Sequence, residues 1–483
     1  MGFGIYIHIP FCKQKCFYCD FASTAKKVDE TLYEQYINAL CQEITMYQAL
    51  FPDICIDTIY FGGGTPSILP PDLIIRALNT VKANFTLNSD IEITLEANPG
   101  TVDEQKLQYF YQNGINRLSF GVQAVQDDLL QKIGRIHTIK EAEMAIEMAQ
   151  KIGFKNISMD LMYGLPGQTL EMLKEAVSWA VNKNMQHISI YGLQIEENTV
   201  FGRLYDQGKL ILPSEDESEM MYDYLTEQLP KYNYNRYEIS NFAKIGYESR
   251  HNLAYWQDKF YLGLGAGAHG YYNQKRVQNP FDIDEYIKKC NQKILPFINE
   301  EIVDEKAHIE EFCFLGLRMA KGIDKEIFKQ KFNTDIENLY GEILPNLEKE
   351  QNISIKIDLG LLLTKKEIKL PYEQSLIIDK ICGQDEVMKL SGREHCFIDM
   401  DKINGDLFIR KRQNGDRITP KGMTGSKKVK DILIDRKIPA EDRDKIPLIC
   451  DEKGIIWIAG IQQDNNYLVN KNSKHILYLK LKK

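Results

Sequence analysis

Short runs of β-branched and aromatic residues alternate with longer amphipathic stretches over the first 200 residues. The short runs predict strands, and the stretches in which apolar residues recur every three or four positions predict helices. Regular alternation of the two predicts a parallel sheet, because each helix returns the chain to the start of the next strand. The expected strands are Ile5–Ile9, Thr58–Phe61, Ile91–Glu96, Arg117–Val122, Ile157–Met162 and His187–Tyr191, and the expected helices include Glu30–Ala49, Pro71–Ala83, Glu104–Gln112, Ile139–Lys151 and Leu170–Val181.

Six βα units are fewer than the eight of a closed barrel, so residues 1–214 predict an α/β fold, as an incomplete barrel or a curved open sheet. Functional side chains of such sheets gather at the carboxyl ends of the strands, where the βα loops meet. Over residues 215–370 the alternation gives way to a predicted helical region with a glycine-rich loop, Tyr261–Gly270. Residues 371–394 are expected to form a linker, and residues 395–483 a separate small α+β domain.

Composition narrows these expectations. A chain of 483 residues, 43% hydrophobic and 27% charged, predicts two or three globular domains, and no apolar run approaches the roughly 20 residues of a membrane span. The first residues lack the basic start and cleavage site of a secretory signal, so we expect a cytoplasmic protein. The net charge of −8 disfavours nucleic-acid binding by the whole chain, yet Leu407–Lys445 holds twelve Lys or Arg against six Asp or Glu.

Three of the ten cysteines, Cys12, Cys16 and Cys19, fall within eight residues directly after the first predicted strand. In a reducing compartment such crowding favours metal binding over disulfides. Three thiolates can ligate three irons of a [4Fe–4S] cubane and leave the fourth iron for a ligand with an amino and a carboxylate group. S-adenosylmethionine has such groups, and its reductive cleavage yields a carbon radical. The alternatives are thiols that lie together by chance and a structural zinc site, which usually needs a fourth protein ligand that is not evident nearby.

Further candidates lie at the ends of the following strands. Phe61–Pro66 contains a glycine triplet that would let the backbone approach a ligand, although such triplets are often only turns. Glu96 ends the third predicted strand, where its carboxylate could accept hydrogen bonds from ribose hydroxyls or simply be solvated. Residues at or beyond the next strands could line the same opening: Gln123, Arg135 and Asp160.

Several stretches together resemble the oxygen-independent coproporphyrinogen III oxidase family of radical-SAM proteins, most closely its HemW-type heme chaperone branch. The resemblance covers about residues 4–370 and implies an incomplete (β/α)6 radical-SAM barrel. The stretches that carry it are Tyr6–Cys12, Phe61–Pro66, Ser119–Gln123, Asp160–Thr169 and His251–Trp256.

This resemblance implies specific roles. It makes Cys12, Cys16 and Cys19 the ligands of a [4Fe–4S] cluster. It also implies heme as cargo and a heme-accepting target protein as partner. The residues expected to contact S-adenosylmethionine, including a second molecule of it, are Tyr6, Gly63, Gly64, Thr65, Glu96, Gln123, Arg135 and Asp160.

Two departures from the oxidases favour the chaperone over oxidative decarboxylation of coproporphyrinogen III in porphyrin biosynthesis. Oxidases have an extension before the cysteine motif and a fourth cysteine two residues after it, whereas here the motif lies close to Met1 and Phe21 takes that position. The stretch His251–Trp256 offers an imidazole and a phenol, His251 and Tyr255, as candidate heme ligands. Alternatively, His251 caps its helix or satisfies a hydrogen bond in the core.

The last part of the chain, about residues 395–483, resembles the C-terminal domain of tRNA(Ile)-lysidine synthetase through Arg410–Met423 and Gly425–Asp431. The Ser-Gly-Gly-x-Asp-Ser loop of the synthetase's catalytic domain has no counterpart, so lysidine formation is not implied. Weak tRNA contact is the expectation, and a merely solvated basic face is the alternative. The candidate RNA-binding residues are Arg410, Arg412, Arg417, Lys427, Lys428 and Lys430.

Overall fold

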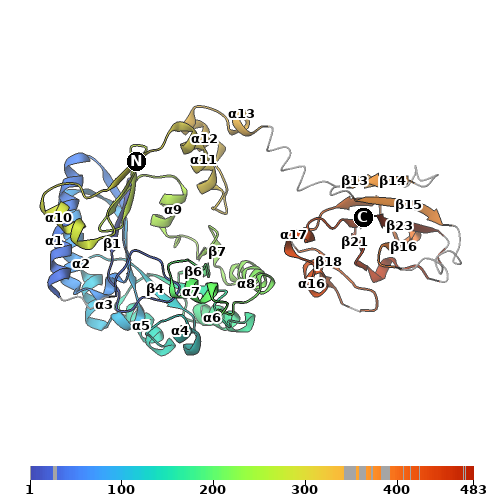
Figure 1. The fold of residues 1–483 in the computed structure, drawn as a ribbon, viewed down its shortest axis with the longest axis horizontal. Coiled ribbons are helices and arrows are strands. Elements are labelled where there is room, and N and C mark those ends of the chain that lie inside the picture. Colours follow the sequence, from blue (N-terminus) through green and yellow to red (C-terminus); the bar gives the residue numbers. More distant parts are fainter. Residues whose placement is uncertain are drawn as a thin grey trace. The chain divides into compact units, whose positions relative to one another are not determined.

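The computed structural model divides into two compact units, residues 1–333 and residues 334–483 (Figure 1). Each unit has hydrophobic clusters of its own. The structure describes residues 2–25, 30–341, 355–357, 366–370, 374–381, 392–405, 407–413, 415–423, 425–470, 473 and 475–482.

Six parallel strands form the centre of the first unit, as the alternating pattern predicts. The predicted helices are also confirmed to within two residues at each end, and a short helix, α4, adds to them. The strands are β1 (Gly2–Ile9), β2 (Cys55–Gly63), β3 (Thr86–Ala97), β4 (Arg117–Gln123), β5 (Asn156–Tyr163) and β6 (His187–Gly192), and the helices are α1 (Glu30–Leu50), α2 (Pro71–Asn84), α3 (Glu104–Gln112), α4 (Asp127–Lys132), α5 (Ile139–Ile152) and α6 (Leu170–Asn182).

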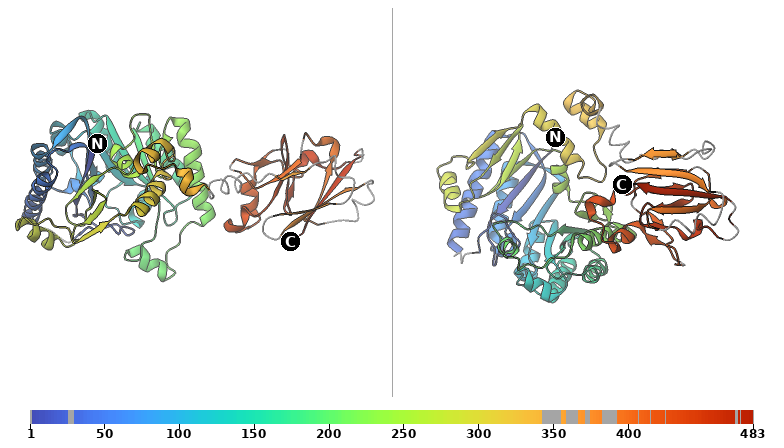
Figure 2. Two further views of the ribbon diagram at one scale, coloured as in Figure 1. Left: turned by 90° about the horizontal axis from the view of Figure 1, so that it is seen from above. Right: turned by 45° about the vertical axis from the view of Figure 1, so that its right-hand side comes forward.

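The two faces of this sheet differ in chemistry because successive side chains of a strand point to opposite sides. On β1, Ile5 and Ile7 are fully buried in the hydrophobic core that contains the side chains of α1 and α2. Tyr6 and His8 point to the other face, where polar side chains predominate. Helices α1, α2, α3, α5 and α6 cover the apolar, outer face (Figures 1 and 2). The inner face therefore remains available for a site.

The expectation of a helical region over residues 215–370 is corrected by the structure. This region also contains strands, which extend the sheet on both sides. The described sheet is mixed and runs β12-β11-β10-β9-β1-β2-β3-β4-β5-β6-β8-β7. The strands are β7 (Asn235–Arg236), β8 (Asn241–Ala243), β9 (Tyr261–Leu264), β10 (His269–Tyr272), β11 (Lys275–Gln278) and β12 (Asn299–Ile302); the helices are α7 (Val200–Asp206), which precedes this region, α8 (Glu215–Gln228), α9 (Arg250–Trp256), α10 (Ile283–Asn291), α11 (Glu305–Gly316) and α12 (Lys325–Phe332).

The glycine-rich segment Tyr261–Gly270, expected to be a loop, is two strands joined by a turn. β9 pairs in parallel with β1, and β10 packs antiparallel beside β9. Glycine has a low strand propensity, which hid these strands, but it is required here by close packing. A Cβ at Gly263 would lie 1.8 Å from the carbonyl oxygen of His269.

The second unit is an α+β domain of small antiparallel sheets, as expected, but it begins at residue 334 rather than at residue 395. Its sheets run β13-β17-β20-β21-β22, β14-β15-β23-β16 and β18-β19. β15 (Ser375–Ile381) lies within the expected linker 371–394 and pairs with β14 and β23, so Ser375–Ile381 is part of a sheet rather than a linker. Residues 371–373 and 382–391 lie outside the described residues. The other elements are α13 (Ile336–Tyr340), β13 (Ile355–Ile357), β14 (Lys366–Lys369), β16 (His395–Asp399), β17 (Leu407–Arg410), β18 (Arg417–Ile418), β19 (Lys427–Lys428), α16 (Val429–Asp435), α17 (Ala440–Arg443), β20 (Leu448–Asp451), β21 (Gly454–Ile458), β22 (Gln462–Gln463) and β23 (Ile476–Lys482). Among the residues described in both units, no helix is long and apolar enough to cross a membrane.

Candidate functional site

A cavity of about 310 Å³ lies at the carboxyl ends of the parallel strands in the first unit. The sequence-predicted residues converge there, although they come from five different strand ends or loops. Those that line the cavity are Cys12, Cys16, Cys19, Gly63, Gly64, Thr65, Glu96, Gln123, Arg135 and Asp160.

The cysteine loop that follows β1 is anchored at both ends and in the middle. Cys12 N donates to the carbonyl of Thr24 at 2.9 Å, which closes the loop on itself. Phe17 N donates to the carbonyl of Ile133 at 3.0 Å, and the Gln14 side chain donates to the carbonyl of Gly134 at 3.0 Å. The loop is therefore held against the segment that follows α4, and the three thiols face one cavity.

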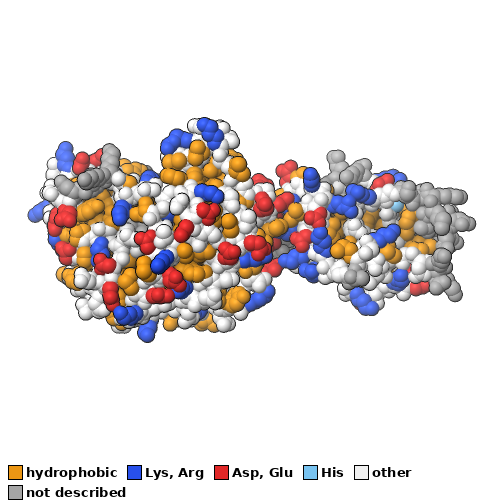
Figure 3. Space-filling model, turned by 90° about the horizontal axis from the view of Figure 1, so that it is seen from below, with side chains coloured by type: hydrophobic (Ala, Val, Ile, Leu, Met, Phe, Trp, Pro, Cys, Tyr) orange, Lys and Arg blue, Asp and Glu red, His pale blue; other side chains and the backbone are white. Residues whose placement is uncertain are grey.

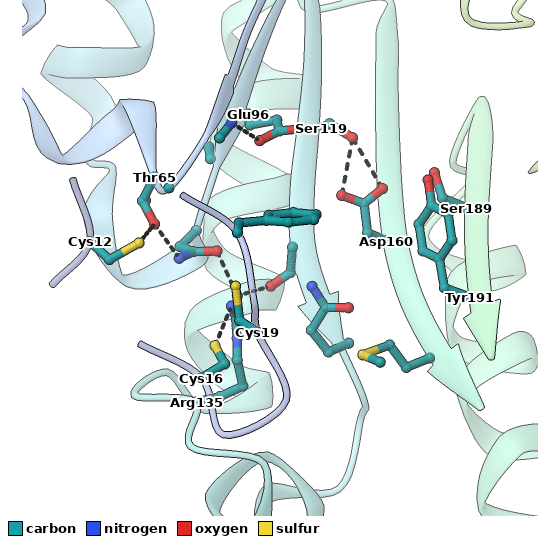
Figure 4. Close-up of a pocket in the computed structure, with 18 of the residues that line it drawn as sticks. Cys12, Cys16, Cys19, Thr65, Glu96, Ser119, Arg135, Asp160, Ser189 and Tyr191 are labelled. Atoms are coloured by element: carbon teal, nitrogen blue, oxygen red, sulfur yellow. Dashed lines mark hydrogen bonds between the residues drawn. The ribbon is translucent and has the colours of Figure 1, made fainter. Parts of the chain in front are cut away.

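Two polar side chains contact the thiols directly (Figure 4). Arg135 Nη1 donates to Cys16 Sγ at 3.4 Å, and Thr65 Oγ1 donates to Cys12 Sγ at 3.7 Å. Burial raises the pKa of Cys12 and raises that of Cys19 to about 11, so these thiols need the charge of a bound metal to ionise near neutral pH. Among the described residues, no three His, Cys, Asp or Glu side chains converge as a single metal ion would require.

Two carboxyl groups stand on the strands facing the cysteines. Glu96 Oε1 accepts from Tyr60 Oη at 2.7 Å, and its Oε2 accepts from the backbone of Gly63 at 3.2 Å. Burial, with a contribution from the charge of Asp160, raises the pKa of Glu96 to about 7. Asp160 accepts from Ser119 Oγ at 3.1 Å, and burial raises its pKa as well. Both carboxyls can accept hydrogen bonds from a ligand in the cavity.

Tyr6, also expected at the ligand, does not line the cavity. Its hydroxyl is hydrogen-bonded to His8 Nδ1 at 2.9 Å, and its ring stacks on Tyr60. Sequence reasoning missed several lining residues that share a strand face with predicted ones. Counting in steps of two along β4 and β6 would have found some of them. These additional lining residues are Tyr60, Asn98, Arg117, Ser119, Ser189, Tyr191 and Asn252.

The candidate heme ligands His251 and Tyr255 lie on α9, where His251 contacts Thr58 of β2 and Glu92 of β3 on the inner face of the sheet. His251 is 1% exposed; its Nδ1 is hydrogen-bonded to Thr58 Oγ1 at 2.8 Å and its Nε2 to Tyr255 Oη at 2.9 Å. Burial, with the nearby positive charge of Arg117, lowers the pKa of His251 to about 3. Heme ligation by His251 stays a prediction, and it would require one of these two hydrogen bonds to break.

The candidate RNA-binding residues of the second unit are partly occupied by contacts within the unit. Arg410 forms a two-point ion pair with Asp416 at 2.7 and 2.8 Å. Arg412 pairs with Asp444 at 2.6 Å, and Lys427 pairs with Asp435. Arg417 donates to Ser426, and Lys430 is buried. Lys428 lies on β19 beside Arg417.

Comparison with known families and structures agrees with this geometry. Residues 6–180 match the radical SAM superfamily, residues 303–367 the HemN C-terminal domain, and residues 407–480 the TilS substrate C-terminal domain. Coproporphyrinogen III oxidase (HemN) of Escherichia coli has the same fold, with 22% identity, a TM-score of 0.64, and coverage of 72% of this chain and 84% of its own. The first unit is therefore a radical-SAM fold.

Closer relatives identify the branch. The heme chaperone HemW of Bacillus subtilis is 41% identical over 348 residues, which are 71% of this chain and 90% of the relative. That of Haemophilus influenzae is 42% identical over 337 residues, 68% of this chain and 85% of the relative. The chain belongs to the HemW heme chaperone family.

Proposed function

We propose that Cys12, Cys16 and Cys19 hold a [4Fe–4S] cluster and that S-adenosylmethionine binds beside it. The observation that carries this is the convergence of three thiols and seven further predicted residues on one cavity. Three thiols that line one cavity can ligate three irons of a cubane, whereas a structural zinc ion usually takes four protein ligands. When bound, the cluster supplies one electron for reductive chemistry.

The ligand of the cluster would be oriented by this chain's own side chains. The backbone at Gly63 and Gly64 has no room for side chains: a Cβ at Gly64 would lie 2.6 Å from the carbonyl oxygen of Phe11. This leaves the β2 turn close to the cysteine loop. Glu96 and Asp160 would accept hydrogen bonds from hydroxyl groups of the ligand and attract its positive sulfonium. Arg135 would hold Cys16 rather than the ligand, as its donation to Sγ suggests.

We propose that the protein carries heme to a target protein in the cytoplasm. Membership of the HemW family supports this, and so does Phe21, which is 61% exposed at the position where the oxidases have a fourth cysteine. The test is heme titration and coproporphyrinogen III turnover on one anaerobic preparation. We expect saturable heme binding and no protoporphyrinogen IX. Robust formation of protoporphyrinogen IX would move the assignment to porphyrin biosynthesis.

A second candidate function belongs to the second unit, because residues 407–480 match the TilS substrate C-terminal domain. We propose weak contact with structured RNA. Figure 3 shows Lys and Arg side chains on the visible face of this unit with Asp and Glu among them. Since Arg410, Arg412 and Lys427 are already paired with acids, a phosphate would have to compete with these carboxylates, and affinity should be low and strongly salt-dependent.

The test is a salt series of tRNA binding by the full chain. The variant carries Lys428→Gln and Arg417→Gln, which should weaken binding and flatten the slope of log affinity against log salt by about one unit per lost contact. A matched control replaces Lys151, which is exposed, and Lys174, which is half-buried, with Gln; both are lysines of the first unit. Identical slopes for all three proteins, or no binding at low salt, would make the second unit irrelevant to RNA.

A further inference from the structure

The turn between β9 and β10 brings His269 to the inner face of the sheet. The strand register establishes this: Tyr271 lies opposite Tyr261, and Tyr261 lies beside Gly4 of β1. Paired residues point to the same side, and residues two apart on one strand do so as well. His269 therefore shares its face with Tyr6 and His8, which neighbour the cavity. Tyr272, one residue out of step, packs on the other face against Tyr47 of α1.

His269 differs from the other histidines of the first unit in accessibility. That unit contains six histidines. Five of them are between 0% and 6% exposed: His8, His137, His187, His251 and His308. Only His269 is exposed to solvent. Partial burial lowers its pKa, so the imidazole is neutral at physiological pH, the state in which it can bind a metal. An incoming heme could reach this imidazole without any rearrangement of the core.

Two exposed aromatic side chains belong to segments that come close to the turn before this histidine. Phe21 is 61% exposed and Phe281 is 59% exposed, which is unusual for such large aromatic groups. Phe281 lies at the turn that precedes His269, and so does Ala22, the residue that follows Phe21: a Cβ on Gly267 would lie 2.8 Å from the Cβ of Ala22 and 3.1 Å from the ring of Phe281. The turn thus places Phe281 close to His269 in the chain fold, with Phe21 one residue from Ala22, and aromatic side chains near an imidazole fit a flat, largely apolar ligand with a metal at its centre.

A positive charge completes the set. Lys15 is exposed, and its Nζ donates to the carbonyl oxygen of Phe21 at 3.0 Å. An ammonium group held beside an aromatic surface is suited to a carboxylate at the edge of a flat ligand, as the propionates of heme are. Phe21 follows Cys19 by two residues, and both Phe21 and Lys15 line the cavity of the cysteines, so these two residues adjoin the cysteine loop.

We propose that His269 is an axial ligand of the heme that this protein carries, with the porphyrin against Phe21 and Phe281 and a propionate at Lys15. The inference rests on the proposed heme-carrying function. It assigns the heme iron to the exposed imidazole of His269 at the start of β10. The imidazole of His251 instead keeps its hydrogen bonds to Thr58 and Tyr255 and contributes to stability.

The experiment is an anaerobic hemin titration of the full chain with its cluster, followed by absorption and electron paramagnetic resonance spectra of the heme. His269→Ala should weaken heme binding at least tenfold and abolish the imidazole-ligand spectrum, and added free imidazole should restore that spectrum. His269→Cys should keep heme but give a thiolate-ligand spectrum. Iron and sulfide content of each variant shows that its fold and cluster are intact.

Matched control variants distinguish heme binding near His269 from heme binding by exposed histidine or aromatic side chains elsewhere on the protein. His475→Ala removes the exposed histidine of the second unit, and Phe314→Ala removes an aromatic side chain of α11 that is 66% exposed. Both should bind heme as the wild type does, whereas Phe21→Ala and Phe281→Ala should each weaken binding several-fold.

The outcomes are distinguishable. If the wild type binds no heme, the proposed function fails. If it binds heme, and the spectra of His269→Ala and His269→Cys equal the wild-type spectrum, the function stands and the assignment of His269 is overturned. A loss of the imidazole spectrum in His251→Ala with unchanged spectra in both His269 variants would transfer the ligand to His251.

Discussion

The inner face of the parallel sheet carries the same kinds of polar residue at its two ends, in different surroundings. We call the end at the carboxyl termini of the strands the upper end and the opposite end, beside α9, the lower end. At the upper end, Glu96, Ser119 and Asp160 line the cavity beside the cysteine loop. At the lower end, the carboxylate of Glu92 accepts from the backbone N–H groups of Arg250 and His251 at 3.1 and 3.0 Å, in the first turn of α9. Buried carboxyls therefore face a cavity at one end and cap a helix at the other.

The two ends differ in whether the protein itself supplies the hydrogen-bond partners of the buried polar side chains. His187, also at the lower end, is bonded to Ser158 at 2.8 Å and to Tyr237 at 2.7 Å, so both ring nitrogens are used within the protein. The cavity leaves room for a ligand to supply partners at the upper end. Burial and polarity alone consequently do not identify a candidate functional residue. A buried polar side chain is a candidate when it also faces a cavity that a ligand could enter.

The largest expected effect is the loss of the cluster at the upper end without a change in stability at the lower end. Replacing Cys12, Cys16 and Cys19 together with Ala should reduce the content of the reconstituted protein from about four irons and four sulfides per chain to none. The lower end should be unaffected, so the melting temperature of the cluster-free protein should stay within a few degrees of the wild-type apoprotein. Iron and sulfide analysis and thermal unfolding measure both. Cys55→Ala and Cys313→Ala, which change half-buried thiols elsewhere, should retain the cluster.

A second prediction compares two isosteric changes. Glu92→Gln should destabilise the first unit by about 1–3 kcal/mol, because one of two buried backbone donors at the start of α9 loses its charged acceptor. Glu96→Gln should cost much less, since burial already raises the pKa of Glu96 to about 7 and half of the carboxyls are neutral there. Thermal unfolding of both variants at pH 7 decides. Equal losses would erase the distinction between the two ends.

The smallest expected effect is a pH dependence at the upper end. Because the pKa of Glu96 is raised to about 7, its carboxyl is mostly protonated at pH 6 and ionised at pH 8. Only the ionised form attracts the positive sulfonium, so affinity for S-adenosylmethionine should rise with pH, by about tenfold at most for each unit below the pKa. Equilibrium dialysis from pH 6 to pH 8 measures this. Glu96→Gln should flatten the profile; an unchanged slope would exclude Glu96 as its source.

Much of the architecture follows from local pattern. The six central strands and the helices between them carry clear periodicities, and alternation along β1 already separates buried Ile5 and Ile7 from Tyr6 and His8. The strand-end rule places Glu96, Gln123 and Asp160 at one opening. The same reasoning missed Ser189 and Tyr191, which lie on β6 in step with the predicted residues. It also missed β9 and β10, whose glycines carry little strand signal.

The sequence by itself determined the βα repeat, the cysteine loop at its mouth and the family resemblance, because these depend on neighbouring residues and on spacing. Only the tertiary structure decided which polar residues face the cavity and which close the lower end. Thr58 and His251 are 193 positions apart and meet only after β2 and α9 have packed. The exposure of His269 likewise depends on β9 pairing with β1, a contact between distant segments that no local pattern encodes.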